Sequence, residues 1–431
     1  ERGRHRAGRA QAQEALIGSL PVRDDLPLFQ ASIEECEANR AHPYPVVSLF
    51  SGAMGLDIGL EQAGLRTVVA QDIDRWCIET IRRNRHVAVE GDLRALLAQD
   101  PALGNLMDVC GMRGQEIFAV VGGPPCQPFS TAGKRLGVAD ERGQLSTYFV
   151  QAVQALRPRF FVMENVKGLA SMRTEPGQPH SQPVLEHILG QFAALGYHTV
   201  HGVLDAVHYG TAQFRERLVI IGSRDGEDIF LPEPTHFPRH QDLALRWRTL
   251  GDALQGLAEP GPHAKFSSAI AQYLPLIPEG GNWKNLPEPL RKQAMGGAYE
   301  SGGGKVGFYR RLSRSEPSPT LVTSPVQKAT LLGHPTQIRP LSVLEYARIQ
   351  GFPDDWHFEG ALSDCYRQIG NAVPVPLGKA IGQALIAAAQ GTARIHVKRM
   401  SRTSVHQRLL KPLPLGEEDE ACSHKKKKKK R

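Results

Sequence analysis

The sequence predicts an α/β fold in which a doubly wound parallel sheet is joined to a smaller, irregular second domain. Over residues 45–222, short apolar segments alternate with helical patterns, and this rhythm is typical of βαβ units. The rhythm stops over residues 224–335, where Pro and Gly are frequent, and helical patterns return from about residue 338. Ligands of doubly wound sheets bind at the carboxyl ends of the strands, so functional side chains are expected there.

The elements of this fold follow one another along the chain. Strands are predicted where apolar and β-branched residues cluster, at residues 45–50, 67–70, 87–90, 117–121, 160–163, 200–204 and 218–221. Helices are predicted where apolar residues recur every three or four positions, at residues 56–63, 74–84, 143–157, 183–195, 342–350 and 376–389. Five regions are expected: a poorly ordered N-terminal extension with little core (1–43), the sheet domain (44–223), the irregular domain (224–337), a return to the sheet domain (338–392), and a tail with a disordered basic end (393–431).

Cysteine usage and hydropathy exclude several classes of protein. The 431 residues include six scattered cysteines without C-x-x-C pairs, namely Cys36, Cys77, Cys110, Cys126, Cys365 and Cys422. This pattern predicts neither a disulfide framework nor a metal site, and it suits a reducing cytosol. No apolar run approaches the roughly 18 residues of a membrane span, and no signal peptide is visible, so no contact with a membrane is expected.

The net charge of +8 is concentrated at the C-terminus. Residues 425–431 supply seven positive charges, and without them the chain carries 45 basic and 44 acidic residues. We interpret this tail as a disordered end or an expression remnant. A polyanion site must then be a local patch. Residues 282–314 are a candidate, because seven Lys or Arg residues stand there against two Glu, with four aromatic residues interleaved. A solvated loop explains this composition equally well.

The most informative segment follows the strand predicted at residues 117–121. It reads Gly122-Gly-Pro-Pro-Cys126-Gln-Pro-Phe-Ser130. A lone cysteine is usually a small buried apolar residue. A cysteine in a Gly-Gly-Pro-Pro loop beyond a strand is better explained as a nucleophile that faces a bound substrate. The position of Cys126 in this loop therefore predicts that the protein is an enzyme.

Turn and acidic residues follow the first three predicted strands. The first strand runs into Phe50-Ser-Gly-Ala-Met-Gly-Leu56, where glycines allow a tight turn and a close approach of backbone to ligand. Asp72 ends the second strand and Asp92 follows the third, and such carboxylates can accept hydrogen bonds from ribose or adenine. Asp74 fits the N-cap of a helix better. Together these strand ends predict a nucleoside ligand.

A second group of polar residues accompanies later strands. Glu164 follows the strand at residues 160–163, where burial would raise its pKa and make it a proton donor near neutral pH. Gln213-Phe-Arg215-Glu-Arg217 precedes the last strand. Arginines at i and i+2 of an extended chain share a face and could converge on an oxyanion or phosphate. Ion pairing with Glu164 or Glu216 is the alternative explanation.

These segments, in this order, resemble the DNA (cytosine-5) methyltransferases of bacterial restriction–modification systems. The resemblance extends to residues 339–345, 348–353 and 370–374, and it covers about residues 45–222 and 338–388. It implies a class I S-adenosylmethionine-dependent methyltransferase with a Rossmann-like sheet, and a target-recognition domain at residues 224–337. Two departures are small: Met54 stands where glycine is common, and Asp72 where glutamate is frequent.

The resemblance also implies the cofactor and the residues that hold it. S-adenosylmethionine would be the methyl donor, S-adenosylhomocysteine the product, and no metal would take part. Its pocket would be closed by the C-terminal helix, which then packs on the first domain. The implied cofactor residues are Phe50, Gly52, Gly55, Leu56, Asp72, Ile73, Asp92, Asn371 and Val373.

The implied reaction is a methyl transfer to a flipped-out cytosine. Cys126 would attack C6, Glu164 would protonate N3, and Arg215 and Arg217 would bind O2 and orient the Cys126 loop. The base must leave the duplex first, and residues 130–143 would close over it. The expected DNA contacts are Ser130, Lys134, Arg135, Gln213, Arg310 and Arg311.

Two other functions remain open at this point. One is methylation of tRNA, although that branch has a compact recognition region with a Cys-Phe-Thr tripeptide that this chain lacks. The other is a catalytically silent DNA-binding protein. The favoured partner is double-stranded DNA, with a cognate restriction endonuclease acting on the same site without direct contact. We expect a monomer in the bacterial cytoplasm, associated with the nucleoid.

Overall fold

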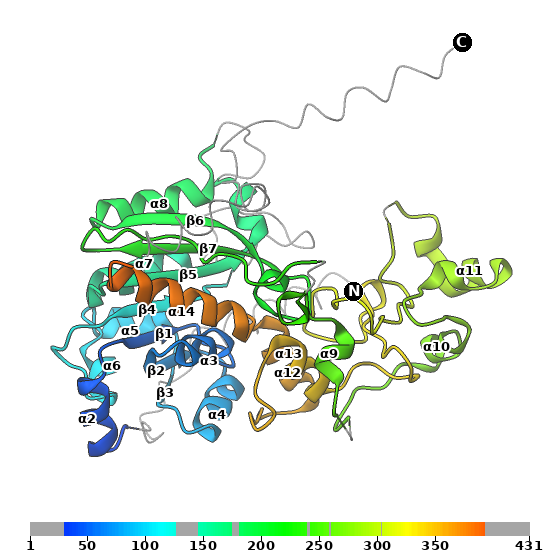
Figure 1. Ribbon diagram of the computed structural model, residues 1–431, viewed down its shortest axis with the longest axis horizontal. Coiled ribbons are helices and arrows are strands. Elements are labelled where there is room, and N and C mark those ends of the chain that lie inside the picture. The colour runs from blue at the N-terminus through cyan, green and yellow to red at the C-terminus, as the bar shows by residue number, and fades with distance from the viewer. Residues whose placement is uncertain are drawn as a thin grey trace, which may run out of the picture.

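The structure, a computed structural model, describes residues 30–125, 145–174, 181–238, 242–257, 260–302 and 304–392. In these residues a layered α/β body carries the sheet, and a less regular part with short helices extends to one side (Figure 1). The chain enters this second part after β7 (Glu216–Ser223) and returns to the body through α12 (Val343–Gln350), α13 (Leu362–Asn371) and α14 (Val375–Ala389).

The described residues form one seven-stranded sheet with the order β3-β2-β1-β4-β5-β7-β6. Each strand lies where the sequence predicts one. The strands are β1 (Pro45–Leu49), β2 (Arg66–Asp72), β3 (Ala88–Glu90), β4 (Ala119–Gly122), β5 (Phe160–Val166), β6 (His198–Asp205) and β7. The order reverses between β1 and β4, and such a reversal opens a crevice at the carboxyl ends of the strands.

The sheet is mixed, whereas the sequence analysis predicted a parallel one. β7 runs antiparallel to both β5 and β6, while the remaining pairs are parallel. Only residues 206–215 connect β6 to β7. A parallel crossover needs a dozen or more residues, usually with a helix, so this short connection requires an antiparallel return.

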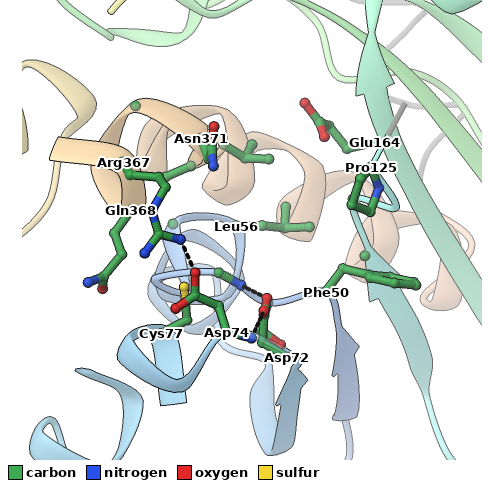
Figure 2. Close-up of a pocket in the computed structure, with 18 of the residues that line it drawn as sticks. Phe50, Leu56, Asp72, Asp74, Cys77, Pro125, Glu164, Arg367, Gln368 and Asn371 are labelled. Carbon is green, nitrogen blue, oxygen red and sulfur yellow. Dashed lines mark hydrogen bonds and ion pairs between the residues drawn. The ribbon is translucent and has the colours of Figure 1, made fainter. Parts of the chain in front are cut away.

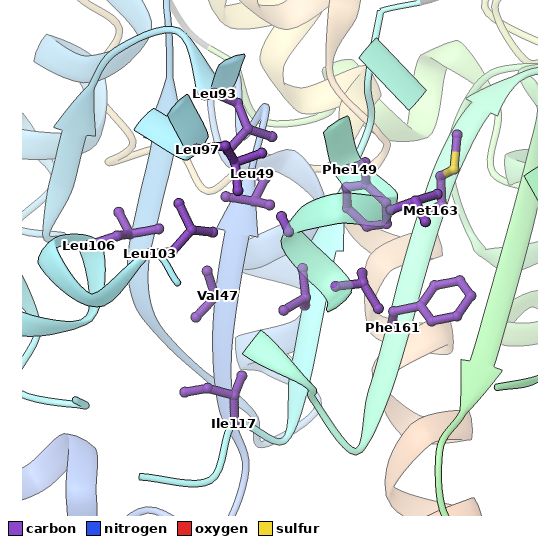
Figure 3. Close-up of a cluster of buried hydrophobic side chains, with 14 of the residues drawn as sticks. Val47, Leu49, Leu93, Leu97, Leu103, Leu106, Ile117, Phe149, Phe161 and Met163 are labelled. Atoms are coloured by element: carbon purple, nitrogen blue, oxygen red, sulfur yellow. The ribbon is translucent and has the colours of Figure 1, made fainter. Parts of the chain in front are cut away.

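Side chains of the central strands alternate between two hydrophobic layers. Val47 of β1 and Phe161 of β5 face one layer, and their neighbours Val46 and Phe160 face the other. Figure 3 shows the first layer, which is covered by α5, α6, α7 and α8; α3 and α14 cover the second. Burial on both faces is the rule for such sheets. The helices of the body are α2 (Ile33–Ala41), α3 (Gly55–Gln62), α4 (Arg75–Arg83), α5 (Leu93–Gln99), α6 (Gly104–Val109), α7 (Leu145–Leu156) and α8 (Val184–Ala194).

Helices α3 and α14 pack unusually closely, although more than 300 residues separate them in the sequence. A Cβ on Gly59 would lie 2.3 Å from the carbonyl oxygen of Val375, and one on Gly378 would lie 2.5 Å from that of Leu56. Glycine is therefore required at both positions. Contacts nearer the C-terminus of α3 are made by residues nearer the C-terminus of α14, so the two helices run in the same direction. The expectation that the C-terminal helix returns to the first domain is confirmed.

One helical stretch of the described chain, Leu362–Ala389, is long and apolar enough to cross a membrane. However, 61% of its most apolar window is buried inside the protein. Because α14 occupies the second hydrophobic layer, its composition is explained by its place in the core.

Helix α2 lies in the region expected to be an N-terminal extension. It begins with a capping box, in which Ser32 and Glu35 exchange hydrogen bonds. Asn39 is buried and donates to the carbonyl oxygen of Cys110 at 3.0 Å, which holds α2 to the body. The Ser-x-x-Glu pattern was a visible signal for this helix that the sequence analysis missed.

The second part of the structure has a small core of its own. Its helices are α9 (Leu250–Leu254), α10 (Ser268–Ala271) and α11 (Glu288–Met295), and most of the chain between them is irregular, as predicted. The core gathers Ile270, Tyr273, Leu274, Ile277, Leu286, Met295, Tyr309 and Leu331. A separate cluster packs Leu250, Leu312 and Leu332 against α12 and α13 and so joins this part to the body.

Candidate active site

A cavity of about 660 Å³ opens at the carboxyl ends of β1, β2, β4 and β5. We call it the central cavity (Figure 2). It is closed on the far side by α13 and by residues 320–323 from the end of the irregular part. It brings together most of the predicted site residues, namely Phe50, Gly52, Gly55, Leu56, Asp72, Ile73, Glu164, Arg215, Arg217, Asn371 and Val373.

The turn between β1 and α3 forms one wall of the central cavity. Phe50, Gly52 and Met54 all have positive φ angles, of 53°, 56° and 64°. For a residue with a side chain, this conformation costs about 1–2 kcal/mol. Met54 is fully buried, and burying such a side chain contributes roughly 1.5–3 kcal/mol. Burial can thus offset the strain of methionine at the position where glycine is common.

Asp72 lies at the end of β2 with its carboxylate turned toward that wall. Its Oδ2 accepts a hydrogen bond from Gly52 N–H, and its Oδ1 accepts one from Asp74 N–H, both at 2.8 Å. Burial raises the pKa of Asp72 to about 6. Each oxygen keeps a further lone pair for a ligand hydroxyl. Asp74 caps α4 through Trp76 N–H at 3.0 Å, as the sequence predicts.

Asp92 is not among the residues that line the central cavity. It caps α5, where its Oδ1 accepts the N–H of Arg94 at 2.9 Å. Its two oxygens also accept hydrogen bonds from the Arg94 guanidinium, the shortest at 2.6 Å. The carboxylate expected to bind adenine is therefore paired with Arg94 in this structure, although Gly91, the residue before it, donates to the carbonyl oxygen of Asp72 at 3.0 Å.

Glu164 lies at the end of β5 and is only 8% exposed. Its Oε1 pairs with Nε of Arg217 at 2.7 Å. Burial raises the pKa of Glu164, and the nearby Arg217 and Arg215 oppose that shift. Gly123 leaves room for this carboxyl, because a Cβ there would lie 2.8 Å from Glu164 Oε2. The glycine of the Gly-Gly-Pro-Pro loop thus allows the loop to approach the acid.

Alternate residues of the segment 213–217 point inward. Arg215 and Arg217 both line the central cavity, whereas Phe214 and Glu216 are exposed. The predicted shared face of the two arginines is confirmed. Arg215 is fully buried and donates to the carbonyl oxygens of Leu321 at 3.0 Å and Gly370 at 2.7 Å. Burial, assisted by the charge of Arg217, lowers the pKa of Arg215 to about 9, so it stays charged at pH 7.

Gln213 is inside the protein, although it was expected to contact DNA. Its side chain is 0% exposed. It donates to Gln350 Oε1 at 2.7 Å and accepts from Leu321 N–H at 3.1 Å. A direct contact with DNA would require breaking both bonds. Through these hydrogen bonds, the Gln213 side chain links the segment before β7 to residue 321 and to α12.

Arg310 and Arg311 are half-buried in the irregular part. Arg310 donates to the carbonyl oxygen of Leu331, and Arg311 donates to those of Ile277 and Pro335, at distances of 2.7–2.9 Å. Both guanidinium groups therefore support the local fold. Cys126, Ser130, Lys134 and Arg135 lie outside the described residues. Pro125, which precedes Cys126, lines the central cavity.

The structure adds residues to the site that the sequence analysis missed. Thr320, Val322 and Gln327 reach the central cavity from the irregular part. Arg367 lines it from α13, one helical turn before Asn371. That spacing was a usable signal, since residues four apart share a helix face. Within the described ranges, no three His, Cys, Asp or Glu side chains are placed to hold a metal ion.

The fold and the site together define a class of protein. A seven-stranded sheet of order 3-2-1-4-5-7-6 with β7 antiparallel, and a cavity at the carboxyl ends of its strands, is the α/β class I methyltransferase fold. The chain belongs to the family of C-5 cytosine-specific DNA methylases, whose family model matches residues 44–387. It is therefore an enzyme, a DNA (cytosine-5)-methyltransferase.

Similar proteins support this assignment. The Type II methyltransferase M.Sau96I of Staphylococcus aureus is 39% identical over 375 residues, covering 85% of this chain and 82% of that protein. The Type II methyltransferase M.Eco47II of Escherichia coli is 40% identical over 350 residues, covering 80% and 79%. A crystal structure described as a prophage-encoded DNA modification methyltransferase from E. coli shares 25% identity with a TM-score of 0.56, covering 80% of this chain and 99% of the other. The predicted restriction–modification type is confirmed.

Proposed function

We propose that this enzyme transfers a methyl group from S-adenosylmethionine to C5 of a flipped-out cytosine in a specific duplex DNA sequence. The intermediate is a covalent bond between Cys126 and C6 of the base. The observation that supports this most directly is the buried Glu164–Arg217 pair, which lines the same cavity as Pro125, next to the nucleophile. A carboxyl of raised pKa suits protonation of a ring nitrogen.

The residues of the central cavity fit the proposed cofactor. The volume of the cavity, about 660 Å³, lies within the range of small-molecule sites. Asp72 offers a carboxylate for ribose hydroxyls, and the N-terminus of α3 offers a positive dipole for a ligand carboxylate. Phe50, Leu56 and Val373 supply apolar surface. When bound, S-adenosylmethionine supplies a methyl group carried on a positively charged sulfur.

Each polar group of the site then has a part in the reaction. The Cys126 thiolate adds to C6 while Glu164 gives its proton to N3, so that C5 becomes nucleophilic. Arg217 holds the Glu164 carboxyl and contributes positive charge toward O2 of the base. Arg215 holds the segments that surround the Cys126 loop, because it donates hydrogen bonds to the carbonyl oxygens of Leu321 and Gly370. After methyl transfer a base removes the C5 proton, the thiolate leaves as the C5–C6 double bond forms again, and the proton on N3 returns to Glu164.

The cytosine must leave the helix before any of these steps. Extrusion costs a few kcal/mol, which contacts with the DNA backbone must offset. We propose that Ser130, Lys134 and Arg135 supply contacts from the loop after Cys126. The enzyme acts as a monomer in the bacterial cytoplasm, in association with the nucleoid. A cognate restriction endonuclease would act on the same sequence without direct contact.

Bisulfite sequencing of plasmid DNA from cells that express the chain tests the reaction and reveals the target sequence. We expect fully protected cytosines at one short recurring site. Methyl incorporation into duplex DNA and into total tRNA should be compared in parallel. Labelling of tRNA alone would contradict the proposal and favour the RNA-acting alternative.

Binding of S-adenosylhomocysteine should weaken as the pH falls through about 6. Burial holds the pKa of Asp72 near that value, above its ordinary one, and ribose hydroxyls donate best to the ionised form. Affinity is then full above pH 6 and falls by up to about tenfold per pH unit below it. Isothermal titration calorimetry from pH 5 to 8 measures this slope.

The Asp72→Asn variant should remove that slope. Asp57 is the matched control, because burial also raises its pKa to about 6 and it also lines the cavity. Asp57→Asn should keep the pH dependence of the parent protein. An unchanged slope in Asp72→Asn would show that another group titrates.

The double variant Arg310→Ala/Arg311→Ala should bind duplex DNA more weakly and with a shallower salt dependence. Each lost phosphate contact reduces the slope of log affinity against log salt by about 1. Because both side chains also hold carbonyl oxygens, thermal stability must be measured beside affinity. If DNA affinity and its salt dependence were both unchanged, neither residue would contact DNA.

A further inference from the structure

Arg367 bridges two parts of the chain at the rim of the central cavity. It lies on α13, and its guanidinium forms ion pairs with Asp364 at 2.7 Å and, as Figure 2 shows, with Asp74 at the start of α4. The Arg367 side chain is 37% exposed, and it lines the cavity together with Asp72 and Asn371. None of the roles described above involves it.

The bridge continues through Asp74 to the cavity wall. The Asp74 side chain holds Arg367, while its backbone N–H donates to Asp72 Oδ1 at 2.8 Å. The other oxygen, Asp72 Oδ2, accepts from Gly52 N–H. A continuous series of bonds therefore runs from the turn after β1, through Asp72 and Asp74, to α13. The Asp72 carboxylate therefore accepts hydrogen bonds from both sides of this series.

Arg367 is expected to contribute more to ligand affinity than to folding stability. A partly exposed ion pair contributes little to folding stability. A side chain that orients a ligand-binding group affects affinity more, since loss of an orienting partner can weaken binding 10- to 100-fold, as it does for metal ligands. The positive charge of Arg367 also acts on Asp72 directly, because it opposes the rise in the pKa of that carboxyl.

We infer that Arg367 is a positioning residue for the cofactor, which holds Asp74 and through it Asp72 in the orientation that receives the ribose of S-adenosylmethionine. This inference rests on the proposed use of the central cavity. It adds to that proposal a residue from the C-terminal part of the chain that sets affinity for the adenosine half of the cofactor.

Calorimetric titration with S-adenosylhomocysteine tests the inference on the full chain. Arg367→Ala should raise the Kd about tenfold. Arg367→Lys keeps a positive charge near Asp74 but lacks the forked guanidinium that also pairs with Asp364. The Kd of this variant should therefore lie between those of the parent and the alanine variant. Arg113→Ala is the matched control, because Arg113 forms a similar paired contact with Asp108 at 2.6 Å, away from the cavity.

Two further readouts separate positioning from mere structural support. The midpoint of the pH dependence of S-adenosylhomocysteine binding should move upward in Arg367→Ala, since the charge that favours ionised Asp72 is lost. In steady-state assays, KM for S-adenosylmethionine should rise while kcat at saturation stays at the parent value. A structural defect would lower the melting temperature and kcat without moving the pH midpoint.

An unchanged Kd in a folded Arg367→Ala protein would overturn the inference, as would a fall in kcat with no change in Kd. A parent protein that does not bind S-adenosylhomocysteine would instead overturn the proposed cofactor. The failure of the inference and that of the proposed function are thus distinguishable.

Discussion

Replacement of Cys126 by serine should lower the rate of DNA methylation by a factor of about 10⁴ or more, the scale seen when a catalytic nucleophile is lost. A hydroxyl is a much weaker nucleophile than a thiolate, because it stays protonated near neutral pH. Without addition at C6, cytosine C5 does not become nucleophilic. Incorporation of labelled methyl groups into duplex DNA measures the rate.

Binding must be followed in the same variant, so that loss of chemistry is separated from loss of fold. Cys126→Ser should bind S-adenosylhomocysteine as the parent does. Cys36→Ser is the control, since Cys36 is a half-buried thiol on α2 and is not part of the cavity. A Cys126→Ser enzyme that methylates as fast as the parent would refute the covalent mechanism.

The Glu164→Gln variant should lose about 10²- to 10⁴-fold in kcat, the usual contribution of a general acid. An amide cannot give a proton to N3, so negative charge would build up on the ring. Burial raises the pKa of Glu164, and the parent enzyme uses the protonated form. Its rate should accordingly fall as the pH rises above that pKa. Single-turnover methylation across a pH series measures both effects.

Glu164→Gln also removes the ion pair that the Glu164 carboxyl forms with Arg217 when it is ionised. Breaking a buried ion pair costs about 3–5 kcal/mol of stability, and the two side chains are only 11% and 13% exposed. Glu227→Gln provides the matched control, because Glu227 pairs with Arg159 at 2.6 Å outside the central cavity. It should lose some stability and keep its kcat. If both variants lost kcat to the same degree, Glu164 would have no special part in proton transfer.

The strands could be predicted from the sequence, but the direction of one of them could not. Apolar runs such as residues 160–163 and 218–221 locate strands, because both faces of the sheet are buried. The antiparallel direction of β7 follows from the short connection before it. Strand signals alone do not reveal which neighbour a strand will pair with.

The site was predictable where its residues end strands. Glu164 stands directly after an apolar run and Asp72 one residue beyond another, so their place at the cavity could be foreseen. Asp92 also follows a predicted strand, yet its carboxylate accepts hydrogen bonds from Arg94, two residues later. Arg367 and Thr320 reach the cavity only because distant segments pack against the sheet domain. For Arg367 the four-residue spacing to Asn371 was a local signal, whereas the place of Thr320 depends on tertiary contacts that no local pattern encodes.

The close pairing of α3 with α14 has a consequence for how the protein is made. More than 300 residues separate the two helices, and at about 5–20 residues per second the ribosome needs on the order of 15 to 65 s to supply them. During that time the side of α3 that packs on α14, with Gly55 and Gly59, lacks its helical partner. Nascent chains stalled before α14 should be cut readily near α3 by brief proteolysis. The newly made chain therefore passes through an interval in which the surface that α14 will cover is exposed and the central cavity still lacks Asn371 and Val373.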